Sequence, residues 1–310
     1  MPLRFTLRQL EYLVAVGEAG SIALAAERVN VSSPSISAAT AQLEQEFGLQ
    51  LFLRRHAQGL GLAQGDRQFV AEARAVLAAA ARLGDLANDI TGKVRGRLSI
   101  GCLVTFAQMV LPRVRRSFCD LHPDVEFQQY ELDQAEIFAG LRAARLDAAL
   151  TYDLDIPSDL SFVPLLALAP HVVLHPGHPL ARRAWITPAD LVALPMVLLD
   201  LPFSTDYFLD LFRPTGLRPK VVERTRDLGV MRSMVANGFG YSIANIRPAT
   251  VTAPDGRPLH FVPLRGPAPL ALGLVLAEGA RAALTIRAFL EHCQAGITEA
   301  TLPGLVIGGA

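Results

Sequence analysis

The sequence predicts an α/β protein in which three short helices and one long helix precede a larger region of alternating strands and helices. Apolar residues recur at helical spacing up to about residue 90. From residue 98 onward, short apolar runs of strand length alternate with helical segments instead. The change falls at Thr91 to Arg97, a connector with two glycines. We therefore expect domains at residues 1–63, 64–91 and 92–310.

The first three helices have local start signals. Thr6 and Gln9 have the spacing of a capping box, in which each side chain bonds the backbone amide of the other residue. Ser21 is expected to cap the second helix and Ser33 the third. Pro34 would then occupy the first helical position, where its missing N–H has no intrahelical partner to lose.

The third helix and the segment after it have the layout of a helix-turn-helix with a wing. An inward face is predicted for Ile36, Thr40, Leu43 and Phe47, and an outward face for Ser35, Ala38, Ala39 and Gln42. The residues expected to contact DNA are Ser33, Pro34, Ser35, Ser37, Ala38 and Gln42. After Gly48, a two-stranded wing is expected to bring Arg54 and Arg55 to phosphate. An ordinary three-helix core with a solvated basic edge also fits, because such patterns are short and degenerate.

Five segments resemble, in order and spacing, the amino-terminal domain of LysR-type transcriptional regulators. They are TLRQLEYL at 6–13, GSIALAA at 20–26, VSSPSIS at 31–37, QLEQEFG at 42–48 and LF at 51–52. The resemblance implies a winged helix-turn-helix that binds promoter DNA and a protein that contacts RNA polymerase. Family members often carry Arg or Gln near positions 38 and 39, whereas this chain has Ala38 and Ala39.

Charge and the long helix both favour an oligomer. Residues 1–60 hold five basic and five acidic residues, so one copy should bind DNA weakly and several copies together more tightly. The next segment carries a heptad stripe, of which the residues expected to form a dimer contact are Phe69, Ala73, Val76, Ala80 and Leu83. Such a stripe can also pack on its own domain. The resemblance implies the linker helix of a homodimer or homotetramer.

The rest of the chain predicts a layered α/β domain. Strands are expected at Leu98–Cys102, 125–132 and 146–152, with helices at 105–121 and 133–144, an order that indicates a parallel layout. The resemblance implies two lobes related to periplasmic binding proteins. We expect lobe one at 92–163 plus 266–301 and lobe two at 164–265, with the chain crossing near Phe162–Leu166 and Phe261–Leu264.

A ligand is expected between the lobes, because ligands of such folds lie beyond the carboxyl ends of strands. The candidate effector residues are Val104, Thr105, Phe106, Tyr152, Phe203, Ser204, Thr205, Asn245 and Arg247. Because Arg binds a carboxylate with two hydrogen bonds, we expect a small carboxylated metabolite. Asp153 and Asp206 in the same neighbourhoods leave a cationic or polyhydroxy ligand open. The hydroxyls of Thr105, Ser204 and Thr205 also fit simple helix N-caps.

Catalytic, metal and cofactor chemistry find little support in the sequence. The three cysteines are far apart without a CxxC pair, the seven histidines form no HExxH, and neither a GxSxG elbow nor a dinucleotide fingerprint is present. We expect no enzyme, metal or cofactor. The alternative is a solute-binding protein or small-molecule enzyme on the same two-lobed layout. Charged Arg4, Arg8 and Glu11 interrupt any signal-peptide core, and no apolar run has membrane-span length, which favours the cytoplasm.

Overall fold

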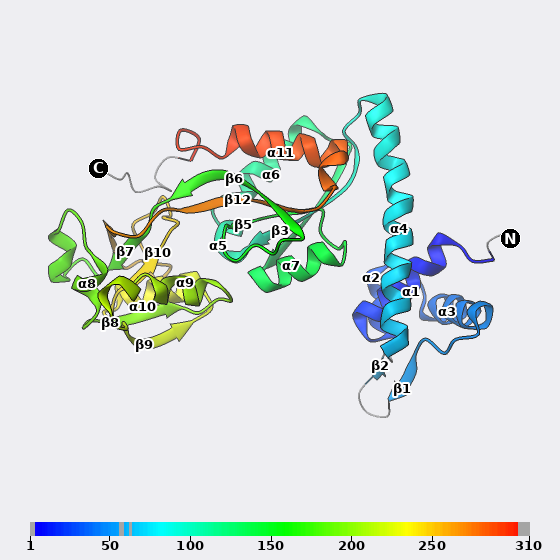
Figure 1. Ribbon diagram of the computed structural model, residues 1–310, viewed down its shortest axis with the longest axis horizontal. Coiled ribbons are helices and arrows are strands. Elements are labelled where there is room, and N and C mark those ends of the chain that lie inside the picture. The colour runs from blue at the N-terminus through cyan, green and yellow to red at the C-terminus, as the bar shows by residue number, and fades with distance from the viewer. Residues whose placement is uncertain (1–3, 56–58, 62–63, 303–310) are drawn as a thin grey trace. The chain divides into compact units, whose positions relative to one another are not determined.

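The computed structural model describes residues 4–55, 59–61 and 64–302. The chain divides into two compact units, residues 1–91 and 92–310. In the first unit, three helices precede a two-stranded antiparallel wing and a long helix (Figure 1). Their bounds are α1 Leu7–Ala19, α2 Ile22–Arg28, α3 Ser33–Phe47, β1 Leu53–Arg55, β2 Gly59–Gly61 and α4 Gln64–Thr91.

Local capping chemistry places the helix starts of the first unit. The predicted capping box is present: Gln9 N donates to Thr6 Oγ1 at 3.2 Å, and Thr6 N donates to Gln9 Oε1 at 2.8 Å. The prediction for α3 was wrong by one residue, because Ser32 is the N-cap and accepts from Ser35 N. Ser32 has the extended backbone of a cap, which puts Pro34 at the second helical position, where an N–H is also dispensable.

The core of the first unit lies among α1, α2, α3 and α4. Its fully buried residues include Leu13, Ile36 and Leu43. Ala39, expected to face outward, is buried, because positions 36, 39, 40 and 43 form one continuous stripe along a helix. Phe47, expected to face inward, lies at the edge and is 38% exposed. Its ring contacts Phe69, with 4.8 Å between centroids.

Lobe one of the second unit is built on a five-stranded mixed sheet in the order β4-β3-β5-β12-β6. The strands are β3 Gly96–Leu103, β4 Val125–Leu132, β5 Ala148–Tyr152, β6 Leu160–Leu168 and β12 Leu270–Ala277. As predicted, β3 runs parallel to β4 and β5, whereas β12 is antiparallel to β5 and β6. Figure 1 shows α6 and α11 on one side of this sheet and α7 on the other.

The helices of lobe one depart once from the prediction. They are α5 Val104–Ala107, α6 Leu111–Leu121, α7 Gln134–Arg142 and α11 Leu284–Gly296, with a 3-10 turn at Ala280–Ala282. A single helix over 105–121 was expected, but α5 ends and α6 begins anew at Leu111. Pro112 explains the break, since its ring would clash inside a continuous helix but fits the first turn of a new one.

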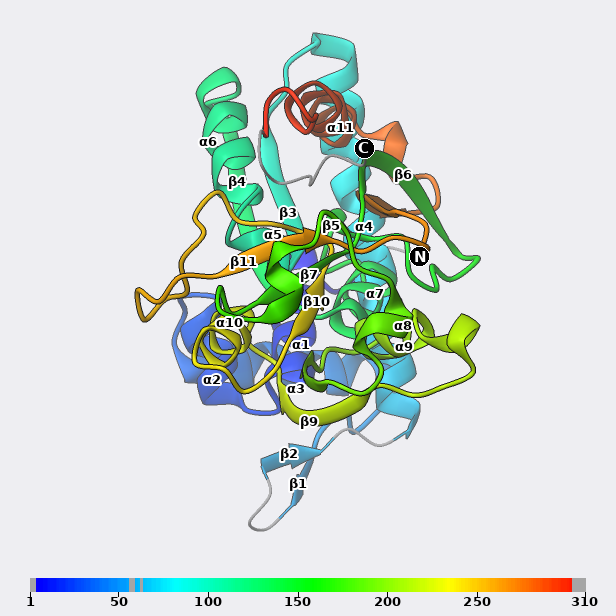
Figure 2. The ribbon, with the colours of Figure 1, turned by 90° about the vertical axis from the view of Figure 1, so that its left-hand side faces the viewer.

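Lobe two has a central antiparallel strand, β7, between β10 and β11, and a parallel pair formed by β8 and β9. Its strands are β7 His171–Leu174, β8 Pro195–Leu199, β9 Lys220–Thr225, β10 Ser242–Ala244 and β11 His260–Pro263. Its helices are α8 Pro188–Leu191, α9 Ser204–Asp210 and α10 Leu228–Ala236, with 3-10 turns at Pro179–Arg182 and Arg213–Thr215. Figure 2 shows α10 on one side of β7 and β10, and α8 and α9 on the other.

Two chain crossings join the lobes. The first lies at Ala169 and Pro170, between β6 and β7, and the return lies between Pro263 and Leu270. The first crossing was predicted too early, near Phe162–Leu166. Strand β6 instead pairs with β12 up to Leu168, because a register shift at Leu272/Gly273 keeps the two strands in contact along their length.

Candidate functional site

The outward side of α3 is the first candidate surface. Pro34, Ser35, Ser37, Ala38 and Gln42 are exposed there, and Ser33 is half-buried. Gln42 is held by α1, because its Oε1 accepts from Gln9 Nε2 at 2.7 Å. The hydroxyls of Ser35 and Ser32 bond each other at 2.8 Å. A short polar surface on a helix that a second helix supports is suited to reading base edges.

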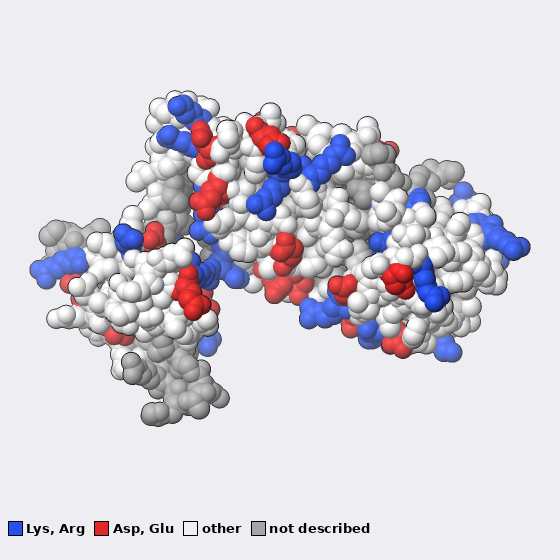
Figure 3. Space-filling view, turned by 180° about the vertical axis from the view of Figure 1, so that it is seen from behind, with Lys and Arg blue, Asp and Glu red and all other residues white. Residues whose placement is uncertain are grey.

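The wing carries the other candidate DNA contacts. Arg54 and Arg55 lie on β1, opposite Leu60 and Gly59 of β2. Their side chains fall outside the described part of the molecule. Elsewhere on the chain charge is mixed: Figure 3 shows Lys and Arg interspersed with Asp and Glu over one face. The chain has 29 basic and 29 acidic residues, so no net charge drives its binding to DNA.

The predicted dimer stripe lies on α4 and has two parts that pack differently. Ala73 is 4% exposed and, with half-buried Phe69, packs into the core of the first unit. Arg74 at this level pairs with Glu18 of α1 at 3.0 Å. Farther along, Val76 is 43% and Leu83 70% exposed, whereas Ala80 is half-buried. The stripe therefore anchors α4 to its own unit at one end and leaves apolar side chains uncovered at the other.

A cavity of about 320 Å³ lies between the two lobes. Lobe one lines it with α5 and with Glu131 of β4, and lobe two lines it with the turn into α10. The lining residues are Val104, Thr105, Ala107, Gln108, Glu131, Arg226, Asp227 and Leu228. Thr105 is buried, and its enclosed hydroxyl lies next to the hydroxyl of Tyr152. The polar side chains of Gln108, Glu131 and Arg226 in this lining are suited to a small ligand.

Sequence reasoning missed six of these lining residues: Ala107, Gln108, Glu131, Arg226, Asp227 and Leu228. Glu131 lies at the carboxyl end of β4, and Arg226 directly follows β9. The rule that found Thr105 at the end of β3 applies to β4 and β9 as well. The positions of Glu131 and Arg226 at strand ends are therefore a signal that the sequence contains.

Two predicted effector residues belong to the core of lobe one instead of the cavity. Phe106 and Tyr152 are 0% and 5% exposed, and their ring centroids are 4.5 Å apart. Burial raises the pKa of the Tyr152 hydroxyl far above its ordinary value, so it stays protonated. The contact between these two rings anchors α5 to the core of lobe one and so positions Thr105 in the cavity lining.

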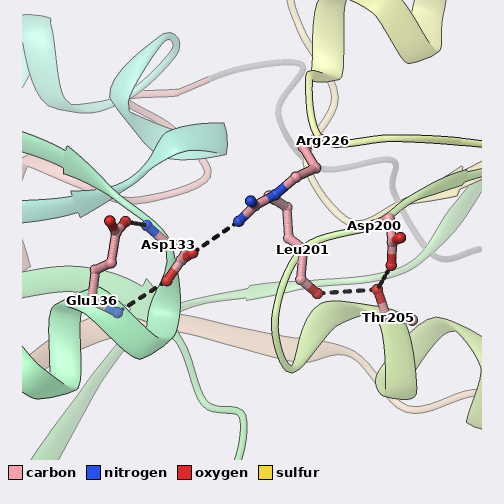
Figure 4. Close-up of polar contacts among 6 residues, drawn as sticks. All are labelled: Asp133, Glu136, Asp200, Leu201, Thr205 and Arg226. Atoms are coloured by element: carbon pink, nitrogen blue, oxygen red, sulfur yellow. Dashed lines mark hydrogen bonds and ion pairs between the residues drawn. The ribbon is translucent and has the colours of Figure 1, made fainter.

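The predicted residues at the start of α9 stabilise their own loop. The Thr205 hydroxyl lies 2.8 Å from Asp200 Oδ1 and 3.1 Å from Leu201 O, either of which can accept its proton (Figure 4). Ser204 is buried. The N-caps of α5 and α9 are Leu103 and Phe203, so the alternative that Thr105, Ser204 and Thr205 are N-caps was wrong. The chain enters α9 through the left-handed backbone of Phe203, whose φ is 64°.

Asn245 and Arg247 lie near the crossing and are not among the residues that line the cavity. Asn245 Nδ2 donates to Leu168 O at 3.1 Å and to the Tyr207 hydroxyl at 2.9 Å. The Arg247 guanidinium lies 5.1 Å from the ring centroid of Phe261. Burial, aided by the charge of Arg247, lowers the pKa of His171 to about 3, so this imidazole is neutral.

The described residues offer no cluster of three or more His, Cys, Asp or Glu side chains placed for a metal ion. Cys102, Cys119 and Cys293 are unpaired. Burial raises the pKa of the Cys102 and Cys293 thiols well above the ordinary value, which disfavours the reactive thiolate. In the part of the chain that the structure describes, no helix is long and apolar enough to cross a membrane.

The two units match known proteins along their length. Residues 7–63 match the bacterial regulatory helix-turn-helix proteins of the lysR family, and residues 91–297 match the LysR substrate binding domain. The Escherichia coli transcriptional activator protein LysR is 30% identical over 294 residues, which cover 94% of each chain.

Solved structures share the fold. HinK, a LysR family transcriptional regulator from Pseudomonas aeruginosa, is 32% identical, with a TM-score of 0.63 over 94% of this chain and 98% of its own. Full-length CbnR, solved with its target DNA, is 24% identical, with a TM-score of 0.64 over 94% and 99%. This chain therefore belongs to the LysR family of DNA-binding transcriptional regulators, which pair a helix-turn-helix with an effector-binding domain and are not enzymes.

Proposed function

We propose that this regulator binds promoter DNA as an oligomer and changes transcription when a small carboxylated metabolite enters the cavity between its lobes. The observation that carries the proposal is the composition of the cavity wall: Thr105 and Glu131 come from lobe one, and Arg226 and Leu228 from lobe two. A ligand held by both lobes has an affinity that depends on their separation. Such differential affinity is what a ligand needs to shift a conformational equilibrium.

Arg226 supports a carboxylate on the ligand, since a guanidinium at a cavity wall makes short charge-assisted bonds to carboxylates. Two acidic groups line the same cavity, and each is held by a neutral donor of its own lobe, so both keep their charge. Asp227 Oδ1 accepts from Val230 N at 2.8 Å, and Glu131 Oε1 accepts from Gln129 Nε2 at 2.6 Å. The Gln108 side chain in the same lining favours a ligand with a second polar group.

On DNA, the exposed residues of α3 are proposed to enter the major groove. Ser35, Ser37 and Gln42 have the donors and acceptors that read base edges, and Ala38 suits contact with a thymine methyl. The start of the helix at Ser33 and Pro34 would lie near the phosphate backbone. Arg54 and Arg55 of the wing would neutralise phosphates.

The uncovered part of α4 is proposed to join two copies of the chain. Val76, Ala80 and Leu83 would pack against a partner helix, while Phe69 and Ala73 fix α4 to its own unit. A homodimer or homotetramer built in this way would hold recognition helices for half-sites about 34 Å apart, or a multiple of that distance. Ligand binding would rearrange the dimers on DNA and change contact with RNA polymerase.

The test combines DNA protection with ligand binding by the full-length chain. We expect nuclease protection of two spaced half-sites upstream of its own or a neighbouring gene. A metabolite that changes this protection should bind in calorimetry, and Thr105→Val should weaken it about tenfold, the effect of losing one buried hydrogen bond. Thr250→Val, at an exposed position of lobe two, is the matched control. Turnover of a small molecule without DNA protection would instead support an enzyme on this layout.

A further inference from the structure

One ion pair joins the two lobes beside the cavity. Arg226 Nη2, between β9 and α10 of lobe two, lies 3.1 Å from Asp133 Oδ2, at the N-cap of α7 in lobe one (Figure 4). By contrast, the pair Arg142–Asp159 lies within lobe one. An ion pair between the lobes is made or broken as the lobes move, whereas an ion pair within one lobe is not.

The two ends of this pair are held very differently. Asp133 Oδ1 accepts from Glu136 N at 3.0 Å, and Asp133 N donates to Glu136 Oε2 at 2.9 Å, so a capping box fixes the carboxylate. The Asp133 side chain is only 14% exposed, whereas that of Arg226 is 68% exposed. Asp133 is therefore a fixed acceptor with one oxygen left for lobe two, and Arg226 is the mobile partner.

A second contact joins the same helix to lobe two. The ring of Phe138, in α7, packs edge-on against Phe203, the N-cap residue of α9, with 5.5 Å between centroids. This apolar contact does not depend on salt, whereas the ion pair does. Helix α7 is thus the part of lobe one that lobe two contacts both by charge and by packing.

Arg226 also lines the cavity, so its guanidinium is within reach of a bound molecule. A carboxylate in the cavity and the carboxylate of Asp133 would compete for the same donor groups. A partly exposed ion pair is weak, which makes such an exchange possible with a modest ligand affinity.

We propose that Asp133 and Arg226 form an ionic latch that favours closure of the two lobes. An effector carboxylate releases this latch by taking Arg226 from Asp133. The latch itself requires only the two lobes. Its release by an effector rests on the proposed function, because it assumes that the cavity is the effector site.

The latch is tested by single-molecule energy transfer between the lobes of the full-length chain, without DNA or effector. Dyes are attached at Glu299→Cys in lobe one and Leu217→Cys in lobe two, both exposed, in a Cys119→Ser background. Labelled chains are diluted into unlabelled ones, so that each oligomer holds one labelled copy. Asp133→Asn removes the charge and keeps the cap, since Asn caps helices as well as Asp does.

Asp133→Asn and Arg226→Gln should each raise the ratio of open to closed molecules about two- to fivefold, the range for a partly exposed pair. Asp159→Asn, which removes an ion pair within lobe one, should leave the ratio unchanged. Molar NaCl should open the wild type and have little further effect on Asp133→Asn. If Asp133→Asn behaves like Asp159→Asn, or if salt does not change the wild type, the latch is refuted. Either result leaves DNA binding and effector binding to be judged by their own experiment.

Discussion

The two units of this protein differ in how their apolar residues are arranged. In the second unit, the large rings Phe106, Phe118 and Phe289 are almost fully buried in one continuous core. In the first unit, α4 leaves Leu83 70% and Ile90 76% exposed. Exposed apolar side chains aligned along a helix indicate a surface that another chain covers. The second unit therefore encloses its large rings in one core, whereas the uncovered apolar side chains of α4 are the surface through which we propose that the first unit associates.

The largest effect should come from the small core of the first unit. Leu13→Ala empties a fully buried site and should cost about 2–5 kcal/mol of unfolding free energy. In calorimetry, the transition of the first unit should fall and DNA binding should be lost, while the second unit unfolds as before. Leu274→Ala, also fully buried but in β12, is the reciprocal variant. A common shift of both transitions would show that the units do not unfold independently.

The buried imidazole of His171 should make the second unit sensitive to acid. Its pKa is lowered to about 3 by burial, whereas an unfolded histidine titrates near 6.5. Below pH 6.5 the unfolded chain therefore takes up a proton that the folded chain excludes. The unfolding free energy should fall by up to about 1.4 kcal/mol per pH unit as pH drops towards 3. Denaturant unfolding at pH 7, 6 and 5 measures this slope.

The variant His171→Leu should reduce that slope, because it removes the histidine whose pKa burial lowers most. His260→Gln, at an exposed position of β11, should keep it. An unchanged slope in His171→Leu would assign the acid sensitivity to other groups.

Association through α4 should depend on its exposed apolar residues. Leu83→Glu places a charge where a partner helix would pack, so the dissociation constant of the dimer should rise at least about tenfold, as burial of an unpaired charge is costly. Sedimentation velocity over a range of concentrations measures it. Ala71→Glu, also exposed on α4 but off the stripe, should associate normally. Equal dissociation of both variants would contradict the role of the stripe.

The smallest effect is expected at the wing. Arg54→Ala should weaken DNA binding and reduce the slope of log affinity against log salt by about 0.9, the value for one lost phosphate contact. Fluorescence anisotropy at several salt concentrations measures the slope. Arg116→Ala, an exposed arginine of the second unit, should leave it unchanged. The same slope in both variants would remove Arg54 from the DNA surface.

Local features of the fold were predictable from the sequence. The Thr6–Gln9 capping box is where it was predicted, and β4 spans Val125–Leu132 as expected. Both follow from interactions between residues close in the chain, namely a reciprocal cap and the alternation that buries Val125 and Phe127. The effect of proline is equally local, so Pro112 indicates the break between α5 and α6. The apolar pattern, taken alone, predicted one continuous helix there.

The site depended on contacts that are distant in the sequence. Of the predicted effector residues, Val104 and Thr105 line the cavity, whereas Phe106 and Tyr152 support it from within the core. Which face of a strand end meets the cavity depends on how the two lobes pack, and no local pattern encodes that packing.

The sequence by itself determined the fold class, the family and the succession of helices in the first unit, because caps, periodicity and family motifs are properties of neighbouring residues. Only the tertiary structure decided that Asp133 faces Arg226 and that Thr105 faces a cavity. Asp133 and Arg226 lie in different lobes, 93 residues apart, and the two chain crossings bring them together. Their approach is a consequence of the folded core, whose packing energy is summed over many side chains and is not visible in any one segment.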